Sequence, residues 1–133
     1  MFSKKTKRET VGSRNFKDLL AWQKSMDLVT ACYKLTANFP ASERYGLTDQ
    51  LRRAAVSIPA NIAEGQGRQY DAEFVRFLYI ASGSLAELET HIQIAQRLDF
   101  LDQVSGDQLL EQCLEVNRLL HGLILFQKKK LDS

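Results

Sequence analysis

The sequence predicts an all-α protein, an antiparallel up-down-up-down four-helix bundle. Apolar residues recur at three- and four-residue steps in four successive segments. These segments, each of about 18 to 28 residues, are separated by short connections rich in proline, glycine or capping residues. Neither an internal repeat nor an alternation of strand and helix patterns competes with this prediction.

The length of 133 residues fits one domain with a sizeable core. The composition, 44% hydrophobic and 26% charged, excludes a largely disordered chain. Residues 1–15 lack apolar periodicity, so we expect a flexible basic N-terminal arm there. Residues 16–130 form the expected four-helix bundle domain.

The first helix is expected over residues 16–38, ending before Pro40 because the residue ahead of a proline avoids helical geometry. A stripe of larger apolar side chains defines its expected core face: Leu19, Trp22, Met26, Val29 and Tyr33. Four further residues widen that stripe: Leu28, Cys32, Leu35 and Phe39.

The second helix is expected from Tyr45 or Gly46 to Ala63 or Glu64, with glycines 65 and 67 supplying the stop. Pro59 lies inside the pattern and predicts a kink or a break. The expected core face comprises Leu47, Leu51, Ala54, Ala55, Ile58 and Ile62.

The third helix is expected to begin at a capping Asp71 and to run to about Leu98. The fourth is expected to begin with Ser105 and Gln108, which stand at capping-box spacing. The expected core of the third helix comprises Phe74, Leu78, Ala81, Leu85, Leu88, Ile92 and Ala95. That of the fourth comprises Leu109, Cys113, Val116, Leu120, Leu123 and Ile124.

Cys32 and Cys113 fall in apolar helical patterns, which predicts two reduced core residues. The sequence has no apolar run of about 18 residues and no apolar segment behind its N-terminal lysines. We therefore expect a cytoplasmic protein that does not enter a membrane.

The net charge of +2 is unevenly distributed. Residues 1–17 carry +5 and residues 128–133 carry +2, which leaves −5 on the body. Basic ends on an acidic body indicate contact with phosphates. The alternative is that charged tails keep an oligomer soluble.

The second and third helices carry small residues on the faces opposite their core stripes. Small side chains let another helix approach closely, and apolar surface beyond what one bundle covers marks an association site. We therefore expect a homo-oligomer; the alternative is a tightly packed monomer. The expected interface comprises Arg53, Ser57, Ala60, Glu64, Ile80, Gly83, Ser84 and Glu87.

Catalytic and metal-binding patterns are not found. Glu87 and His91 are expected to form a hydrogen-bonded pair on one helix face, and His121 has no partner residue within a helical turn. Gly65 and Gly67 follow a helix rather than a strand, which favours a helix end over a phosphate loop. We expect no enzyme activity, no metal and no cofactor.

Four stretches resemble the bacterial family of the 23S rRNA intervening-sequence protein, also called the S23 ribosomal protein family: residues 16–24 (FKDLLAWQK), 45–65 (YGLTDQLRRAAVSIPANIAEG), 74–81 (FVRFLYIA) and 83–90 (GSLAELET). The resemblance implies a four-helix subunit that assembles as a ring, commonly a homopentamer. The chain is also similar to the accessory protein of diversity-generating retroelements, which implies nucleic acid and a reverse transcriptase or another neighbouring gene product as partners.

The favoured hypothesis is a non-catalytic, oligomeric adaptor that binds RNA or DNA. No run of interleaved basic and aromatic residues supports it, and the alternative is a protein–protein interaction scaffold without nucleic-acid contact. A small-molecule or metal-binding bundle has the least support. The candidate nucleic-acid-binding residues are Lys4, Lys5, Lys7, Arg8, Arg14, Lys17, Arg52, Arg68, Arg76, Lys128, Lys129 and Lys130.

Overall fold

The structure, a computed structural model, describes residues 15–132. The described residues form helices and turns without a strand, which confirms the all-α class and the four helices. The elements are η1 (Phe16–Asp18), α2 (Leu20–Thr36), η2 (Ala41–Glu43), α3 (Leu47–Gln66), α4 (Asp71–Arg97) and α5 (Gln103–Asp132).

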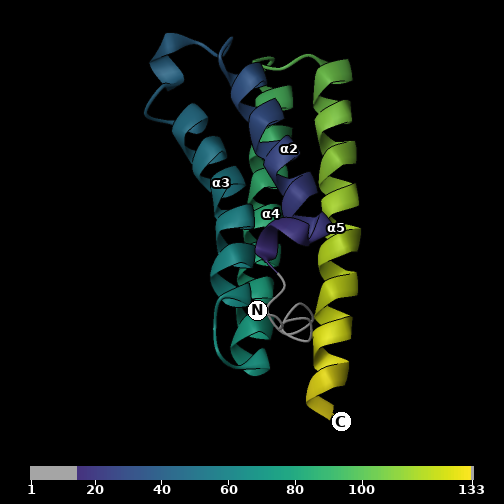
Figure 1. The fold of residues 1–133 in the computed structure, drawn as a ribbon. Coiled ribbons are helices and arrows are strands. Elements are labelled where there is room, and N and C mark those ends of the chain that lie inside the picture. Colours follow the sequence, from purple (N-terminus) through teal and green to yellow (C-terminus); the bar gives the residue numbers. More distant parts are fainter. Residues whose placement is uncertain (1–14, 133) are drawn as a thin grey trace.

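The four α-helices pack side by side around one core (Figure 1). Each neighbouring pair along the chain is in contact, and α2 also packs against α5, which closes the bundle. The α2–α3 and α4–α5 connections lie at one end of the molecule, and the α3–α4 turn lies at the other with the C-terminal end of α5 (Figure 1). None of the helices within residues 15–132 has the length and hydropathy needed to cross a membrane.

The expected first helix is divided into η1 and α2. Asn15 Oδ1 accepts a hydrogen bond from the Lys17 amide at 2.8 Å, and Leu19 then adopts an extended conformation (φ −78°, ψ 125°). The side chain of Gln23 donates to the Lys17 carbonyl at 2.8 Å, and Phe16 packs edge-on against Trp22. The expectation of one continuous helix from residue 16 is wrong because these local contacts stabilise the break.

The buried stripe of α2 also differs from the expected one. Met26 and Tyr33 are 40% and 43% exposed. Leu28 and Cys32 are buried as expected, whereas three further buried positions were not expected: Ala21, Ser25 and Thr36. Two of them are hydroxyl residues, whose burial is tolerated because the hydroxyls of Ser25 and Thr36 donate to main-chain carbonyls of their own helix, at 2.9 and 2.7 Å.

Helix α3 continues through Pro59 and past its expected end. Gly65 lies within the helix, and Gly67 is the C-terminal capping residue. A Cβ atom added to Gly65 would stand 2.6 Å from Phe77 Cβ on α4, which is closer than packed carbon atoms approach. Gly65 therefore allows α3 and α4 to lie close together, and the expectation that it stops the helix is wrong.

The capping residues expected for the last two helices are not the ones used. Asp71 is the first residue of α4 and makes no capping bond; its carboxylate contacts Lys130 at 3.6 Å. The carboxylate of Asp102 accepts bonds from the Ser105 amide and hydroxyl, at 2.8 and 3.0 Å. Helix α5 thus begins at Gln103, ahead of the expected capping box.

The two cysteines are free thiols with no exposed surface, as the sequence predicts. Burial raises the pKa of the Cys32 thiol to about 12 and also raises the pKa of the Cys113 thiol.

Candidate nucleic-acid interface

Five of the basic residues singled out in the sequence lie at one end of the bundle, the end that holds the α3–α4 turn and the C-terminal turns of α5 (Figure 1). Lys130 Nζ lies 3.6 Å from the Asp71 carboxylate, and Lys128 Nζ lies 3.4 Å from the Tyr79 hydroxyl. These contacts join α5 to α4. We call the set the basic end: Arg68, Arg76, Lys128, Lys129 and Lys130.

Aromatic rings lie beside the cations of the basic end. The guanidinium carbons of Arg68 and Arg76 lie 4.8 and 4.7 Å from the centre of the Phe77 ring. The ammonium of Lys128 lies 5.9 Å from the centre of the Tyr79 ring. All three distances fall within the range of cation–π attraction.

A second aromatic contact lies on α5 itself, where Lys130 Nζ is 5.9 Å from the centre of the Phe126 ring. The rings of Tyr79 and Phe126 remain 50% and 58% exposed. Tyr70, in the α3–α4 turn, is 64% exposed. The basic end therefore presents aromatic surface as well as positive charge.

Carboxylates neutralise only part of this charge. Arg68 lies 2.7 Å from Glu64 and 3.9 Å from Glu73. Among the described residues, Arg76 and Lys128 contact aromatic rings rather than carboxylates. Their positive charges are therefore available to a phosphate.

The remaining basic candidates lie elsewhere. Lys17 is exposed in η1, near the middle of the molecule (Figure 1). Arg52 is on α3, sixteen residues before Arg68, which corresponds to about 24 Å along a helix. The structure thus separates Arg52 from the basic end. Outside the described residues lie Lys4, Lys5, Lys7, Arg8 and Arg14.

The residues of the expected assembly face lie on α3 and α4, which pack against each other. The hydroxyl oxygens of Ser57 and Ser84 lie 2.8 Å apart, which joins the two helices at the middle of this face. In the isolated chain Ala60, Ile80 and Gly83 on either side are exposed, and a Cβ atom on Gly83 would meet nothing within 4 Å.

Two charged residues of that face have partners four residues away in the chain. Arg53 pairs with Asp49 at 2.9 Å, and Glu64 pairs with Arg68 at 2.7 Å. The Arg53 side chain is 78% exposed, so this pair adds little stability to a single subunit.

Glu87 lies 3.5 Å from His91 Nε2 on the same helix face, but the hydrogen bond that the sequence predicts between them is not formed. Neither ring nitrogen of His91 makes a hydrogen bond with another described residue. No three metal-binding side chains come together within residues 15–132.

The aromatic rings that lie beside the basic end were not predicted from the sequence. Tyr79 and Lys128 are separated by 49 residues, so no short sequence motif contains both the aromatic ring and the cation. The signal that was available is the periodicity of α4 and α5. Tyr79 falls off the apolar stripe of α4, and Phe126 falls off that of α5.

The fold and this surface define a small all-α protein of four helices whose basic, aromatic-bearing end is its main candidate site. The family model of the 23S rRNA-intervening sequence protein matches residues 17–122. The chain belongs to that family.

A solved structure from Bacteroides thetaiotaomicron VPI-5482 is similar to this chain. It is a protein with unknown function from the S23 ribosomal protein family. The two chains share 25% sequence identity and a TM-score of 0.71, and the similarity covers 79% of this chain and 98% of the other. A comparison with curated proteins finds no match.

Proposed function

We propose that this chain is a non-catalytic adaptor that binds RNA or DNA through the basic end of its bundle. In the proposed form, the bundle is antiparallel, up-down-up-down, and assembles as a homopentameric ring in the cytoplasm. The observation that carries the proposal is the placement of Arg76 and Lys128 against aromatic rings at one end. The names of the family and of its solved member do not specify what these proteins bind.

Cations and rings contribute differently to such binding. Arg76 and Lys128 attract phosphates, and each phosphate contact releases counterions, so the affinity depends steeply on salt. The exposed rings of Tyr70, Tyr79 and Phe126 offer faces on which unpaired bases stack. This combination fits single-stranded nucleic acid better than a duplex, whose bases are already stacked.

Assembly would multiply a weak contact. One basic end offers few unneutralised cations, but a ring carries as many copies of that end as it has subunits. Simultaneous contacts along one strand raise the overall affinity without any new kind of interaction. The small residues around Ser57 and Ser84 support assembly because they leave room for a neighbouring helix.

The binding test is a fluorescence-anisotropy titration of labelled single-stranded RNA and DNA between about 50 and 200 mM salt. The double variant Arg76→Gln/Lys128→Gln is expected to bind about tenfold more weakly at the low-salt end, with a shallower salt dependence. Removal of residues 1–15, which carry five basic side chains, should weaken binding further.

The matched control is Arg118→Gln, which removes one exposed arginine from the middle of α5. It should bind like the wild type. Two results would contradict the proposal: no binding by the wild type at low salt, or equal weakening by Arg118→Gln and the double variant.

A protein–protein scaffold is the second candidate, and exposed apolar residues on α4 and at its C-terminal cap favour it. Ile80 and Ile94 are each 39% exposed, and Leu98 is 53% exposed. The proposed partner is a reverse transcriptase encoded nearby, which rests on the resemblance to the retroelement accessory protein. Co-purification of the two proteins after nuclease treatment would favour this candidate over direct nucleic-acid binding.

A further inference from the structure

A cavity of about 250 Å³ lies at the corner between α2 and α3, at the end of the molecule opposite the basic end (Figure 1). The end of α2, the connection that carries η2, and the first turns of α3 form its walls. Two arginines, Arg44 and Arg52, and two buried threonines, Thr36 and Thr48, line it.

The guanidinium of Arg52 is held in one place. Its Nε donates to Thr36 Oγ1 at 2.8 Å, and its Nη2 donates to the Tyr33 carbonyl at 3.4 Å. Its central carbon lies 4.4 Å from the centre of the Tyr33 ring. These bonds use two of the five N–H groups of the side chain, so the others remain for a ligand.

The acidic residues nearest the cavity are directed to other groups. Glu43 Oε1 accepts a bond from the Leu47 amide at 3.0 Å and so caps α3. Asp49 pairs with Arg53 at 2.9 Å. Among residues 15–132, neither Arg44 nor Arg52 has a carboxylate within ion-pair distance.

We propose that this cavity binds a phosphate group, either inorganic phosphate or the terminal phosphate of an ester. Two guanidinium groups that face one cavity repel each other, and an anion between them would remove that repulsion. Arginine side chains match the oxygens of a phosphate with paired, charge-assisted hydrogen bonds. The Thr48 hydroxyl adds a further donor, while Phe39 and Pro40 supply an apolar wall for the organic part of the ester.

This site is independent of the proposed nucleic-acid interface, because it uses none of the residues of the basic end. The same chemistry could come from inorganic phosphate, from a free nucleotide or from the terminal phosphate of an oligonucleotide. The experiment separates these three sources.

The test is an NMR titration of the ¹⁵N-labelled full chain at constant ionic strength. Its arms are inorganic phosphate, a nucleoside monophosphate, and a short oligonucleotide with and without a 5′-phosphate. Saturable shifts of amides within residues 36–52 are expected in at least one phosphate arm. The arm with the tightest binding identifies the source.

Arg44→Gln and Arg52→Gln should each weaken that binding about tenfold, through loss of charge-assisted bonds. Arg44 is exposed and has no side-chain partner among the described residues, so its variant is expected to fold even if Arg52→Gln does not. Arg97→Gln, an exposed arginine near the same end of the molecule, is the matched control.

Three results would overturn the inference. The first is the absence of saturable shifts in every phosphate arm. The second is shifts confined to residues outside the cavity. The third is equal weakening by Arg97→Gln and Arg44→Gln, because a general loss of positive charge would then explain the binding.

Discussion

At Gly65, helix α3 passes so close to α4 that there is no room for a side chain. The Gly65→Ala variant places a methyl group against Phe77 Cβ, which cannot move aside without moving the backbone of α4. We expect the free energy of unfolding to fall by about 1–3 kcal/mol, the usual cost of overpacking. Chemical denaturation followed by circular dichroism measures this change.

Gly122→Ala is the matched control for Gly65→Ala. Gly122 also lies inside a helix, but a Cβ atom there would meet nothing within 4 Å. Alanine favours the helix over glycine, so this variant should gain about 0.5–1 kcal/mol. If both variants were destabilised equally, the close contact of α3 and α4 at Gly65 would be wrong.

The two buried cysteines should not react with thiol reagents in the folded protein. The raised pKa of Cys32, about 12, leaves only about one thiol in ten thousand ionised at pH 8, and burial blocks access as well. A thiol reagent at pH 8 should therefore label neither cysteine in the native protein and both in denaturant. Rapid labelling of the native protein would contradict the packing of α2 against α5.

Individual residues show which parts of the core could be predicted from the sequence. The apolar stripes of α3, α4 and α5 were predicted well because large aliphatic residues mark them. On α2, Leu28 and Cys32 were predicted, but Ser25 and Thr36 were missed because they look polar in a sequence. Their bonds to carbonyl groups one turn earlier make them suitable for a core.

At the scale of the elements, the N-terminal end of α5 depends on Asp102. Hydrogen bonds from Ser105 lower the pKa of this carboxyl below its ordinary value of 3.8. A lowered folded-state pKa gives stability that is present above pH 3.8 and is lost as the pH falls through the lowered pKa. The Asp102→Ala variant should thus unfold at a lower denaturant concentration at pH 7, with the difference narrowing below pH 3.8.

Two further variants make the test of Asp102 specific. Asp102→Asn keeps a hydrogen-bond acceptor, so it should stay near wild-type stability at pH 7 while losing the pH dependence. Asp27→Ala removes an exposed carboxylate from α2 and should not lower stability. A pH-independent gap between wild type and Asp102→Ala would contradict the capping role.

The existence of the four helices followed from the apolar periodicity of the sequence, but the positions of their ends did not. The break at Leu19 depends on the Asn15 cap and on the hydrogen bond from Gln23 to the Lys17 carbonyl. Neither contact can be predicted from the helix propensities of these residues. The start of α5 was also set too late, because Asp102 takes the capping position ahead of the expected Ser105. Local competition of this kind limits any prediction of boundaries.

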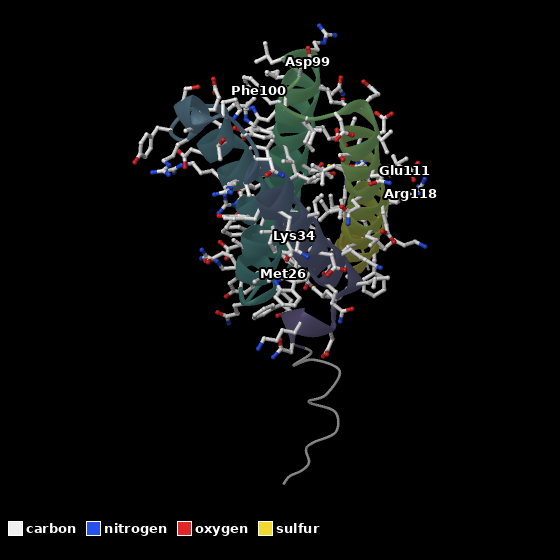
Figure 2. The ribbon with its side chains drawn as sticks, turned by 90° about the horizontal axis from the view of Figure 1, so that it is seen from above. Met26, Lys34, Asp99, Phe100, Glu111 and Arg118 are labelled. Carbon is white, nitrogen blue, oxygen red and sulfur yellow. The ribbon has the colours of Figure 1, made fainter. Side chains whose placement is uncertain are left out.

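At the scale of the whole molecule, the candidate site was only half predictable. The sequence supplied the basic residues, but the packing of α5 on α4 decided which of them share one end of the bundle. Figure 2, viewed along the bundle, shows charged side chains such as Arg118 and Glu111 directed outward from α5. Positive charge alone therefore did not distinguish a site from an ordinary surface.

The assembly face leads to a prediction for one glycine. Gly83 has open space above it in the isolated chain, where a neighbouring subunit is proposed to pack. Gly83→Arg should therefore reduce the assembly to smaller species while leaving the helix content unchanged. Val104→Asp, on an α5 residue that is 67% exposed and outside this face, is the control. If the Gly83→Arg assembly had the same mass as the wild-type assembly, the proposal that α3 and α4 form the interface would be wrong.

The mass of the wild-type protein tests the central claim most directly, because the proposed adaptor depends on several basic ends held together. Sedimentation equilibrium at micromolar concentration should give a species of five subunits of 15.1 kDa each. A single species of 15.1 kDa across that concentration range would contradict the assembly and, with it, the multivalent binding of nucleic acid.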